Sequence, residues 1–245
     1  MAFERLVTPF VSPAARNVLP ALRGNLESFR RAPTLDPFDW TIPEERPFDT
    51  IVSDGEYDRA GRLRVFARVA SIWTIKRLVP RSRPHANATQ FVLSGKTSTM
   101  VRVIRVKGRR RSKNPQLGQV AMWRLEIGNE DAPGCHFHVQ ILGETPQPPF
   151  PKTLPIPRLP SLAVTPAASI ELILAELFQQ RWRDHMRNES PELQSWRSIQ
   201  SRRLTNLLDW QRTQLGMLGS PWSNLKSAKP HSGLFALASS EARRS

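Results

Sequence analysis

Prolines are distributed so unevenly in this chain that they limit where helices and strands can form. Residues 1–50 contain seven of the 22 prolines, and eight more lie between Thr145 and Pro166. Proline lacks the backbone N–H that a helix interior or a central strand needs. We therefore expect residues 1–47 to be an extended proline-rich arm and residues 145–166 to be a proline-rich connector.

Residues 48–144, between these two segments, show the two-residue periodicity of β-strands. From Arg62 to Ile75, apolar side chains alternate with cations, which predicts a long strand with one basic face. A hairpin is predicted over residues 89–107, with its turn at Ser94–Lys96. We interpret residues 48–144 as a basic, mostly antiparallel β domain made of hairpins.

A third hairpin is predicted from two strands, residues 122–127 and 135–141. If they pair so that facing residue numbers add up to 262, Leu125 faces Phe137 and one side of the hairpin is wholly apolar. The other side is polar. Its predicted pairs are Glu126 with His136, Arg124 with His138, and Met122 with Gln140.

Two helix start signals lie in the C-terminal part of the chain. Thr165-Pro166 and Ser190-Pro191 each place a capping hydroxyl before a proline at the first helical position. Apolar stripes follow both signals, so residues 167–215 are predicted to form a helical hairpin. Residues 216–245 are rich in Ser, Gly and Ala, which predicts a flexible tail. The expected fold class is α+β: a mostly antiparallel sheet of hairpins, a C-terminal helical hairpin and a proline-rich N-terminal arm.

The positive charge is concentrated in one segment. The chain has 36 Lys and Arg against 21 Asp and Glu, a formal net charge of +15. The segment from Arg59 to Leu125 has 17 cations and no acidic residue. Nucleic acid is the partner class that matches such a surface, because each neutralised phosphate releases condensed counterions. The candidate nucleic-acid-binding residues are Arg62, Arg64, Arg68, Lys76, Arg77, Arg81, Arg83, Lys96, Arg102, Arg105, Lys107, Arg109, Arg110, Arg111, Lys113 and Arg124.

We expect a nucleic-acid-binding protein that works with other protein subunits in a larger complex. RNA is favoured slightly over DNA, because basic strands and loops suit irregular or single-stranded targets better than a single recognition helix does. The loop from Lys107 to Lys113 has five cations and is the predicted point of contact. A scaffold that docks an acidic protein is an alternative, and a solvated basic face without a specific partner is another.

A histidine-containing string, Cys135-His136-Phe137-His138-Val139-Gln140, could carry chemistry. A strand places both imidazoles and the amide on one side. The string resembles the His-hydrophobe-His motif of the HUH endonucleases, which cleave single-stranded nucleic acid with a tyrosine and a divalent metal. That resemblance implies His136 and His138 as ligands of Mg²⁺ or Mn²⁺, Glu126 or Asp131 as a third ligand, and Tyr57 as the nucleophile.

The same string is similar to the His-x-His-x-Gln variant of the histidine-triad superfamily. This second resemblance implies that His138 attacks phosphorus while His136 and Gln140 bind the phosphate. A phosphodiester-cleaving or nucleotidyl-transfer enzyme is therefore the first alternative function. In the remaining interpretation both histidines are polar-face residues of a strand, and no cofactor is implied.

The expected location is intracellular. A single cysteine, Cys135, excludes an intramolecular disulfide and fits a reducing compartment. No run of apolar residues approaches the ~18 to 20 that span a bilayer, and the N-terminus lacks the apolar core of a secretory signal. We expect no membrane association and a cytoplasmic location, with the mitochondrion as an alternative.

Overall fold

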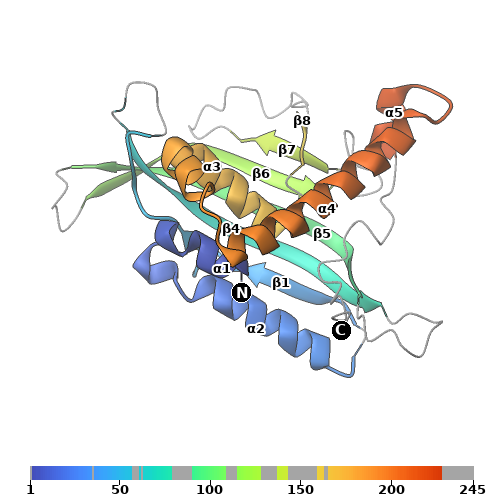
Figure 1. The fold of residues 1–245 in the computed structure, drawn as a ribbon, viewed down its shortest axis with the longest axis horizontal. Coiled ribbons are helices and arrows are strands. Elements are labelled where there is room, and N and C mark those ends of the chain that lie inside the picture. Colours follow the sequence, from blue (N-terminus) through green and yellow to red (C-terminus); the bar gives the residue numbers. More distant parts are fainter. Residues whose placement is uncertain are drawn as a thin grey trace.

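The two longest strands, β4 (Arg64–Leu78) and β5 (Gln90–Lys107), pair along most of their length at the centre of an antiparallel sheet. Figure 1 shows this sheet in the computed structural model, with helices across it. The structure describes residues 2–34, 36–56, 61, 63–78, 90–108, 115–127, 137–142, 159–162 and 165–227.

Within these ranges the sheet has eight strands, in the order β1-β4-β5-β6-β7-β8, and β2 and β3 also pair with β4. All the pairings are antiparallel. The other strands are β1 (Phe38–Ile42), β2 (Phe48–Asp49), β3 (Ser53–Asp54), β6 (Gln116–Ile127), β7 (Phe137–Ile141) and β8 (Leu159–Pro160).

The helices lie at the two ends of the chain. They are α1 (Ala2–Val7), α2 (Val18–Arg31), α3 (Pro166–His185), α4 (Pro191–Leu215) and α5 (Pro221–Ser227), with short 3-10 turns at Thr8–Phe10 and Pro13–Ala15. In the part of the chain that the structure describes, none of these helices combines the length and the apolar character needed to cross a membrane.

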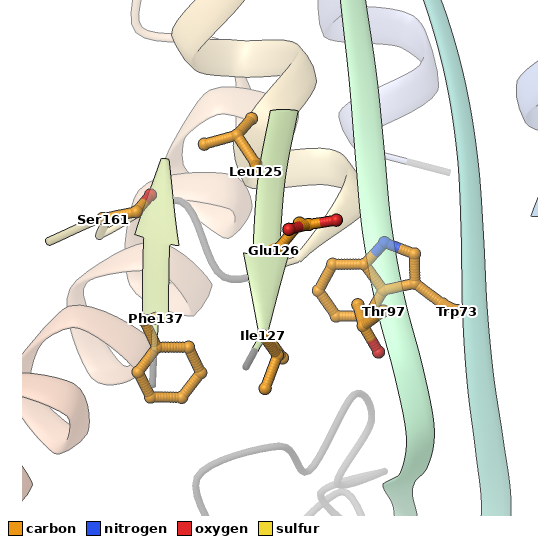
Figure 2. A pocket seen from close by; sticks show the side chains of 7 residues that line it. All are labelled: Trp73, Thr97, Leu125, Glu126, Ile127, Phe137 and Ser161. Carbon is orange, nitrogen blue, oxygen red and sulfur yellow. The ribbon is translucent and has the colours of Figure 1, made fainter. Parts of the chain in front are cut away.

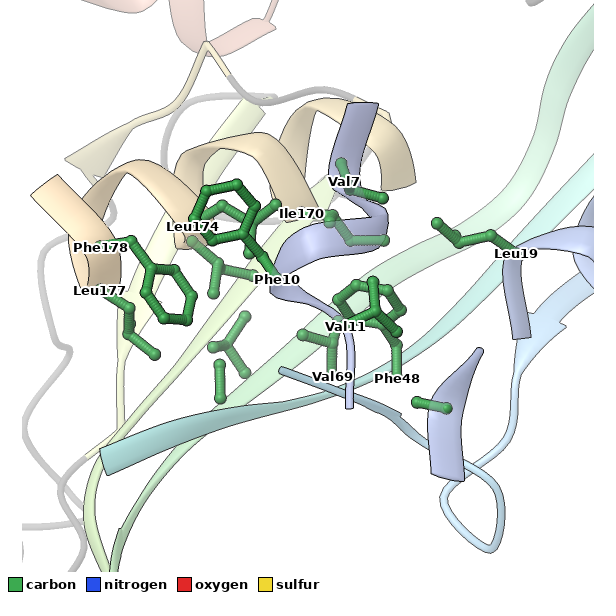
Figure 3. Close-up of a cluster of buried hydrophobic side chains, with 14 of the residues drawn as sticks. Val7, Phe10, Val11, Leu19, Phe48, Val69, Ile170, Leu174, Leu177 and Phe178 are labelled. Carbon is green, nitrogen blue, oxygen red and sulfur yellow. The ribbon is translucent and has the colours of Figure 1, made fainter. Parts of the chain in front are cut away.

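The main core lies between one face of the sheet and the helices. Strand alternation turns Val65, Ala67 and Val69 of β4 toward this core, where they are fully buried. Figure 3 shows Phe10 and Phe178 packed above these strands, with ring centroids 5.0 Å apart. Residues of the predicted arm, the β domain and the helical hairpin therefore contribute to one hydrophobic cluster.

The predicted α+β class and C-terminal helical hairpin are confirmed. Thr165 and Ser190 cap α3 and α4 as expected, by accepting hydrogen bonds from the backbone N–H groups of Ala168 and Leu193. Glu171 of α3 accepts hydrogen bonds from Trp196 Nε1 and Gln200 Nε2, so these side chains join α4 to α3.

The extended conformation predicted for residues 1–47 is wrong, because α1 and α2 are helices. Pro20 lies in the first turn of α2, where no intrahelical partner exists for its missing N–H, so it does not stop the helix. Leu19 and Leu22 of α2 are buried in the core. Tertiary packing of this apolar stripe stabilises a helix that the proline count argued against.

Two predictions about irregular C-terminal segments also need correction. β8 lies inside the predicted connector, where Pro160 pairs with His138 as an edge residue, a position that tolerates a missing N–H. α5 lies inside the predicted flexible tail and begins at Pro221, a residue type suited to the first helical position.

The predicted turn at Ser94–Lys96 is a β-bulge inside β5. The ladder passes from Trp73 opposite Thr97 to Ile75 opposite Leu93, so three residues of β5 face one residue of β4. Glycine suits a bulge as well as a turn, so the local sequence does not distinguish the two. The long partner strand β4 decides the outcome by pairing on both sides of the bulge.

The register predicted for the third hairpin is wrong by two residues. Ile127 pairs with Phe137 and Leu125 with Val139, so the facing residue numbers add up to 264. A two-residue shift leaves every side chain on its predicted face, because strand side chains alternate with a period of two. It does change the polar neighbours, since Glu126 now faces His138.

Candidate nucleic-acid interface

The predicted nucleic-acid-binding cations divide into three groups. Side chains are described for Arg64, Arg68, Lys76, Arg102, Arg105, Lys107 and Arg124. For Arg77 and Lys96 the structure describes only the backbone, in β4 and β5. Arg62, Arg81, Arg83, Arg109, Arg110, Arg111 and Lys113 lie outside the described residues.

Three of the described arginines lie on the sheet face opposite the helices. Arg64 and Arg68 alternate along β4 with residues that point into the core, and Arg102 is the direct ladder partner of Arg68 on β5. This alternation is the one that the sequence predicts. Cations that face each other across a ladder repel, so the pair at Arg68 and Arg102 needs counter-charge.

Acidic residues from the segment before β4 supply that counter-charge. Arg68 donates two hydrogen bonds to Asp49 of β2, at 3.0 and 2.8 Å. The other two arginines each form an ion pair with one carboxylate oxygen. Arg64 Nε lies 2.9 Å from Asp54 Oδ1, and Arg102 Nη2 lies 3.0 Å from Glu44 Oε2.

The pair between Arg68 and Asp49 is the most firmly held of the three. Its hydrogen bonds raise the pKa of the Arg68 guanidinium above the ordinary value; burial acts in the opposite direction and the charge of Asp49 adds to the increase. Two parallel hydrogen bonds also fix the orientation of both groups. Arg68 is thus an anchored residue of the sheet, and its guanidinium lies 5.6 Å from the centre of the Phe66 ring.

The fourth paired arginine, Arg124 on β6, lies 3.1 Å from Glu126 Oε1 through its Nη1 atom. Its Nε atom is buried without a hydrogen-bond partner among the described residues. In the fold, acidic residues from outside the acid-free segment, residues 59–125, therefore supply counter-charge to arginines within it. Sequence reasoning missed Glu44, Asp49 and Asp54 as partners, and their only signal was a position shortly before the basic strand.

Lys76, Arg105 and Lys107 have no ion-pair partner in the part of the chain that is described. Lys76 is exposed near one end of β4, while Arg105 and Lys107 lie at the opposite end of the sheet, on β5. Gly108 follows them with a φ of 119°, a conformation that glycine adopts without strain, and β5 ends there.

The end of the β5–β6 hairpin projects from the body of the protein. In Figure 1 the green strands β5 and β6 reach beyond α3 at the left of the view. In the described part of the sheet, β5 is the only strand that pairs with residues 116–121 of β6. Leu117 is 52% and Val120 is 37% exposed, so side chains of this stretch meet solvent instead of a core.

Of the two histidines in the predicted string, the structure describes only His138. The buried His138 ring lies in a polar cluster with the side chains of Glu126 and Gln140. Its Nε2 atom lies 3.5 Å from Glu126 Oε2 and 3.5 Å from Gln140 Nε2. A ring nitrogen that donates a hydrogen to the carboxylate cannot also accept one from the amide. The contact with Glu126 therefore requires a hydrogen on Nε2, and Gln140 is then a neighbour of the ring without a hydrogen bond to that nitrogen.

Burial and charge have opposite effects on Glu126. Burial raises its pKa, but the hydrogen bond with His138 and the charge and hydrogen bond of Arg124 outweigh it, so the pKa lies below the ordinary value. Glu126 is thus a carboxylate partner for both side chains, not a proton donor at neutral pH.

The catalytic hypotheses gain little from this cluster. His138 is only 1% exposed, so its ring does not face solvent where a phosphodiester could approach. The other residues that the resemblances require, His136 and Tyr57, lie outside the described residues, as does Asp131. Within the described ranges no three His, Cys, Asp or Glu side chains come together as metal ligands. The enzyme interpretation therefore stays a prediction.

A small cavity lies on the core side of the same strands. It measures about 10 Å³, room for one water molecule at most, and it is lined by the side chains shown in Figure 2, including Trp73, Thr97 and Phe137. The described residues around this cavity leave no room for a nucleotide. The hydroxyl Oγ1 of Thr97, one of the lining residues, is buried without a hydrogen-bond partner in the described ranges.

The candidate interface is therefore the hairpin end, where the described cations Arg105 and Lys107 have no ion-pair partner among the described residues. No protein-family model, curated protein sequence or solved structure matches this chain.

Proposed function

We propose that this protein binds nucleic acid, with RNA slightly favoured over DNA, through the projecting end of the β5–β6 hairpin. The observation that carries the proposal is the contrast between paired and unpaired cations. Four arginines of the sheet face have carboxylate partners, whereas Arg105 and Lys107 have none among the described residues. Unpaired cations contribute fully to phosphate binding, because no carboxylate must be displaced.

The sequence after the hairpin strand supports the same end of the molecule. Gly108 is followed by Arg109, Arg110 and Arg111, and then by Lys113. In the sequence these residues belong to the segment that joins β5 to β6. A two-stranded β-ribbon is narrow enough to enter a nucleic-acid groove, and exposed strands with loops also suit single-stranded targets.

Solvent-exposed apolar side chains accompany these cations. Leu117 and Val120 on β6 give the hairpin end an amphipathic surface, which can contact the faces of unstacked bases while the cations contact phosphates. The proposal includes a larger complex with other protein subunits.

The test is a salt titration of binding to a short mixed-sequence single-stranded RNA, followed by fluorescence anisotropy. Replacing Arg105 and Lys107 together with alanine should weaken binding roughly tenfold and reduce the salt slope by about 0.7 for each lost phosphate contact. The matched control replaces two exposed arginines outside the sheet, Arg16 before α2 and Arg31 at the end of α2, and should have a much smaller effect.

Three outcomes contradict parts of the proposal. A salt-independent affinity, or an equal loss in both double variants, overturns the hairpin interface. Equal binding of RNA and DNA of the same sequence removes the preference for RNA. Competition by polyglutamate as strong as that by RNA identifies an acidic protein as the partner instead.

A further inference from the structure

The three ion pairs on the β4–β5 face differ in how tightly they hold their arginines. Asp49 binds Arg68 with both carboxylate oxygens and is only 19% exposed. Glu44 binds Arg102 with one oxygen at 3.0 Å and is 60% exposed. Glu44 therefore has the weaker hold on its arginine.

An exposed ion pair with one hydrogen bond is worth little, because water and salt compete for both partners. A phosphate can replace such a carboxylate at small cost, since it offers the same negative charge and more acceptor oxygens. The two-hydrogen-bond pair of Asp49 with Arg68 is harder to exchange. Asp54 also binds Arg64 with one oxygen, but it is 43% exposed, and Arg64 donates a further hydrogen bond to the Gly108 carbonyl. Glu44 is thus the most exposed of the three carboxylates, and Arg102 is the cation that exchanges its partner most readily.

Arg102 is well placed to extend the hairpin interface. It precedes Arg105 by three residues on β5, a distance of about 10 Å along a strand. Strand alternation puts Arg102 and Arg105 on opposite faces of β5. A nucleic-acid chain that passes around the hairpin end therefore gains a contact on the second face when Arg102 is released.

We propose that Glu44 is a displaceable counter-ion that occupies the phosphate-binding site of Arg102 until nucleic acid replaces it. This inference rests on the proposed function of the hairpin end and assigns a regulatory contact to it. Glu44 acts as a carboxylate mimic of phosphate, so it lowers the affinity for weak polyanions and favours ligands that reach beyond the hairpin.

The test compares two neighbouring glutamates. Glu44→Gln should tighten binding of the same single-stranded RNA about twofold to fivefold, the range that one exposed ion pair supplies. Its salt slope should become steeper by up to about 0.7, because the contact of Arg102 with phosphate no longer has to replace an existing ion pair. Glu45→Gln removes the same charge from an exposed side chain that has no ion pair within the described ranges, and should leave both quantities nearly unchanged.

A third variant identifies the cation. Adding Arg102→Ala to Glu44→Gln should return the affinity and the salt slope to wild-type values. The inference is overturned if both glutamate variants behave alike while wild-type binding stays salt-sensitive and dependent on the hairpin cations. Absence of salt-sensitive binding in every variant overturns the proposed function itself, which separates the two failures.

Discussion

Asp49 on β2 and Arg68 on β4 face each other in the sheet ladder, joined by two hydrogen bonds between carboxylate and guanidinium. This pair joins the segment before β4 to the acid-free segment that contains β4. It also shows that one of the predicted nucleic-acid-binding arginines has a structural role.

Replacing Asp49 with alanine should lower the free energy of unfolding by about 1 to 2 kcal/mol, because it leaves Arg68 half-buried next to Arg102 without its carboxylate. Chemical denaturation measures this change. In the double variant with Arg68→Ala, the two losses should not add, since each single change already removes the pair. Additive losses would show that the pair contributes no coupling energy.

A matched pair of threonines on β5 tests the hydrogen bonding of the core. Thr99 Oγ1 accepts a hydrogen bond of 3.2 Å from Trp73 Nε1, whereas the buried hydroxyl of Thr97 has no partner within the described ranges. Thr99→Val should therefore lower the free energy of unfolding by about 1 to 3 kcal/mol, while Thr97→Val should be neutral or stabilise by up to about 1 kcal/mol. Equal effects of the two substitutions would contradict the assigned hydrogen bond.

Glu126 predicts a pH dependence of stability. Its pKa is lowered in the folded state, so its contribution is fully present above the unfolded value of about 4.5 and is lost as the pH falls through the folded value. The free energy of unfolding should therefore decrease as the medium is acidified below that value. In Glu126→Gln this decrease should be shallower, and parallel curves for the two proteins would argue against the pairing with His138 and Arg124.

The contact between α3 and α4 depends on one carboxylate. Glu171 Oε2 accepts hydrogen bonds from Trp196 Nε1 at 2.9 Å and from Gln200 Nε2 at 2.6 Å. Glu171→Ala should lower the free energy of unfolding by about 1 to 3 kcal/mol, because it leaves the indole N–H of the buried Trp196 without its acceptor. Glu176→Ala, at an exposed position of the same helix, should change it by less than about 0.5 kcal/mol.

Local periodicity was sufficient to predict part of the fold. The alternation along β4 assigns Val65 and Arg64 to opposite faces, and the capping signals at Thr165 and Ser190 locate the starts of α3 and α4. These features depend on neighbouring residues in the chain, so the sequence contains them directly. The shared face of Glu126 and His138 was also predictable, because it depends only on odd and even positions.

Only the tertiary structure decided which polar groups meet. A shift of two residues between β6 and β7 preserves every face, so the hydrophobic pattern cannot distinguish a contact of Glu126 with His136 from one with His138. In the same way, the ion pair of Arg102 with Glu44 joins residues 58 positions apart. Such a separation leaves no periodic signal in the sequence.

The sequence by itself therefore determined that this chain has a basic sheet with one polar face and a helical hairpin after it. The fold decided that acidic residues from the segment before β4 neutralise three of the five arginines of the basic segment whose side chains are described. It also decided that, among the described residues, unpaired cations remain at the ends of the sheet. The physical reason is that charge composition is a property of a segment, whereas counter-charge depends on distance in space.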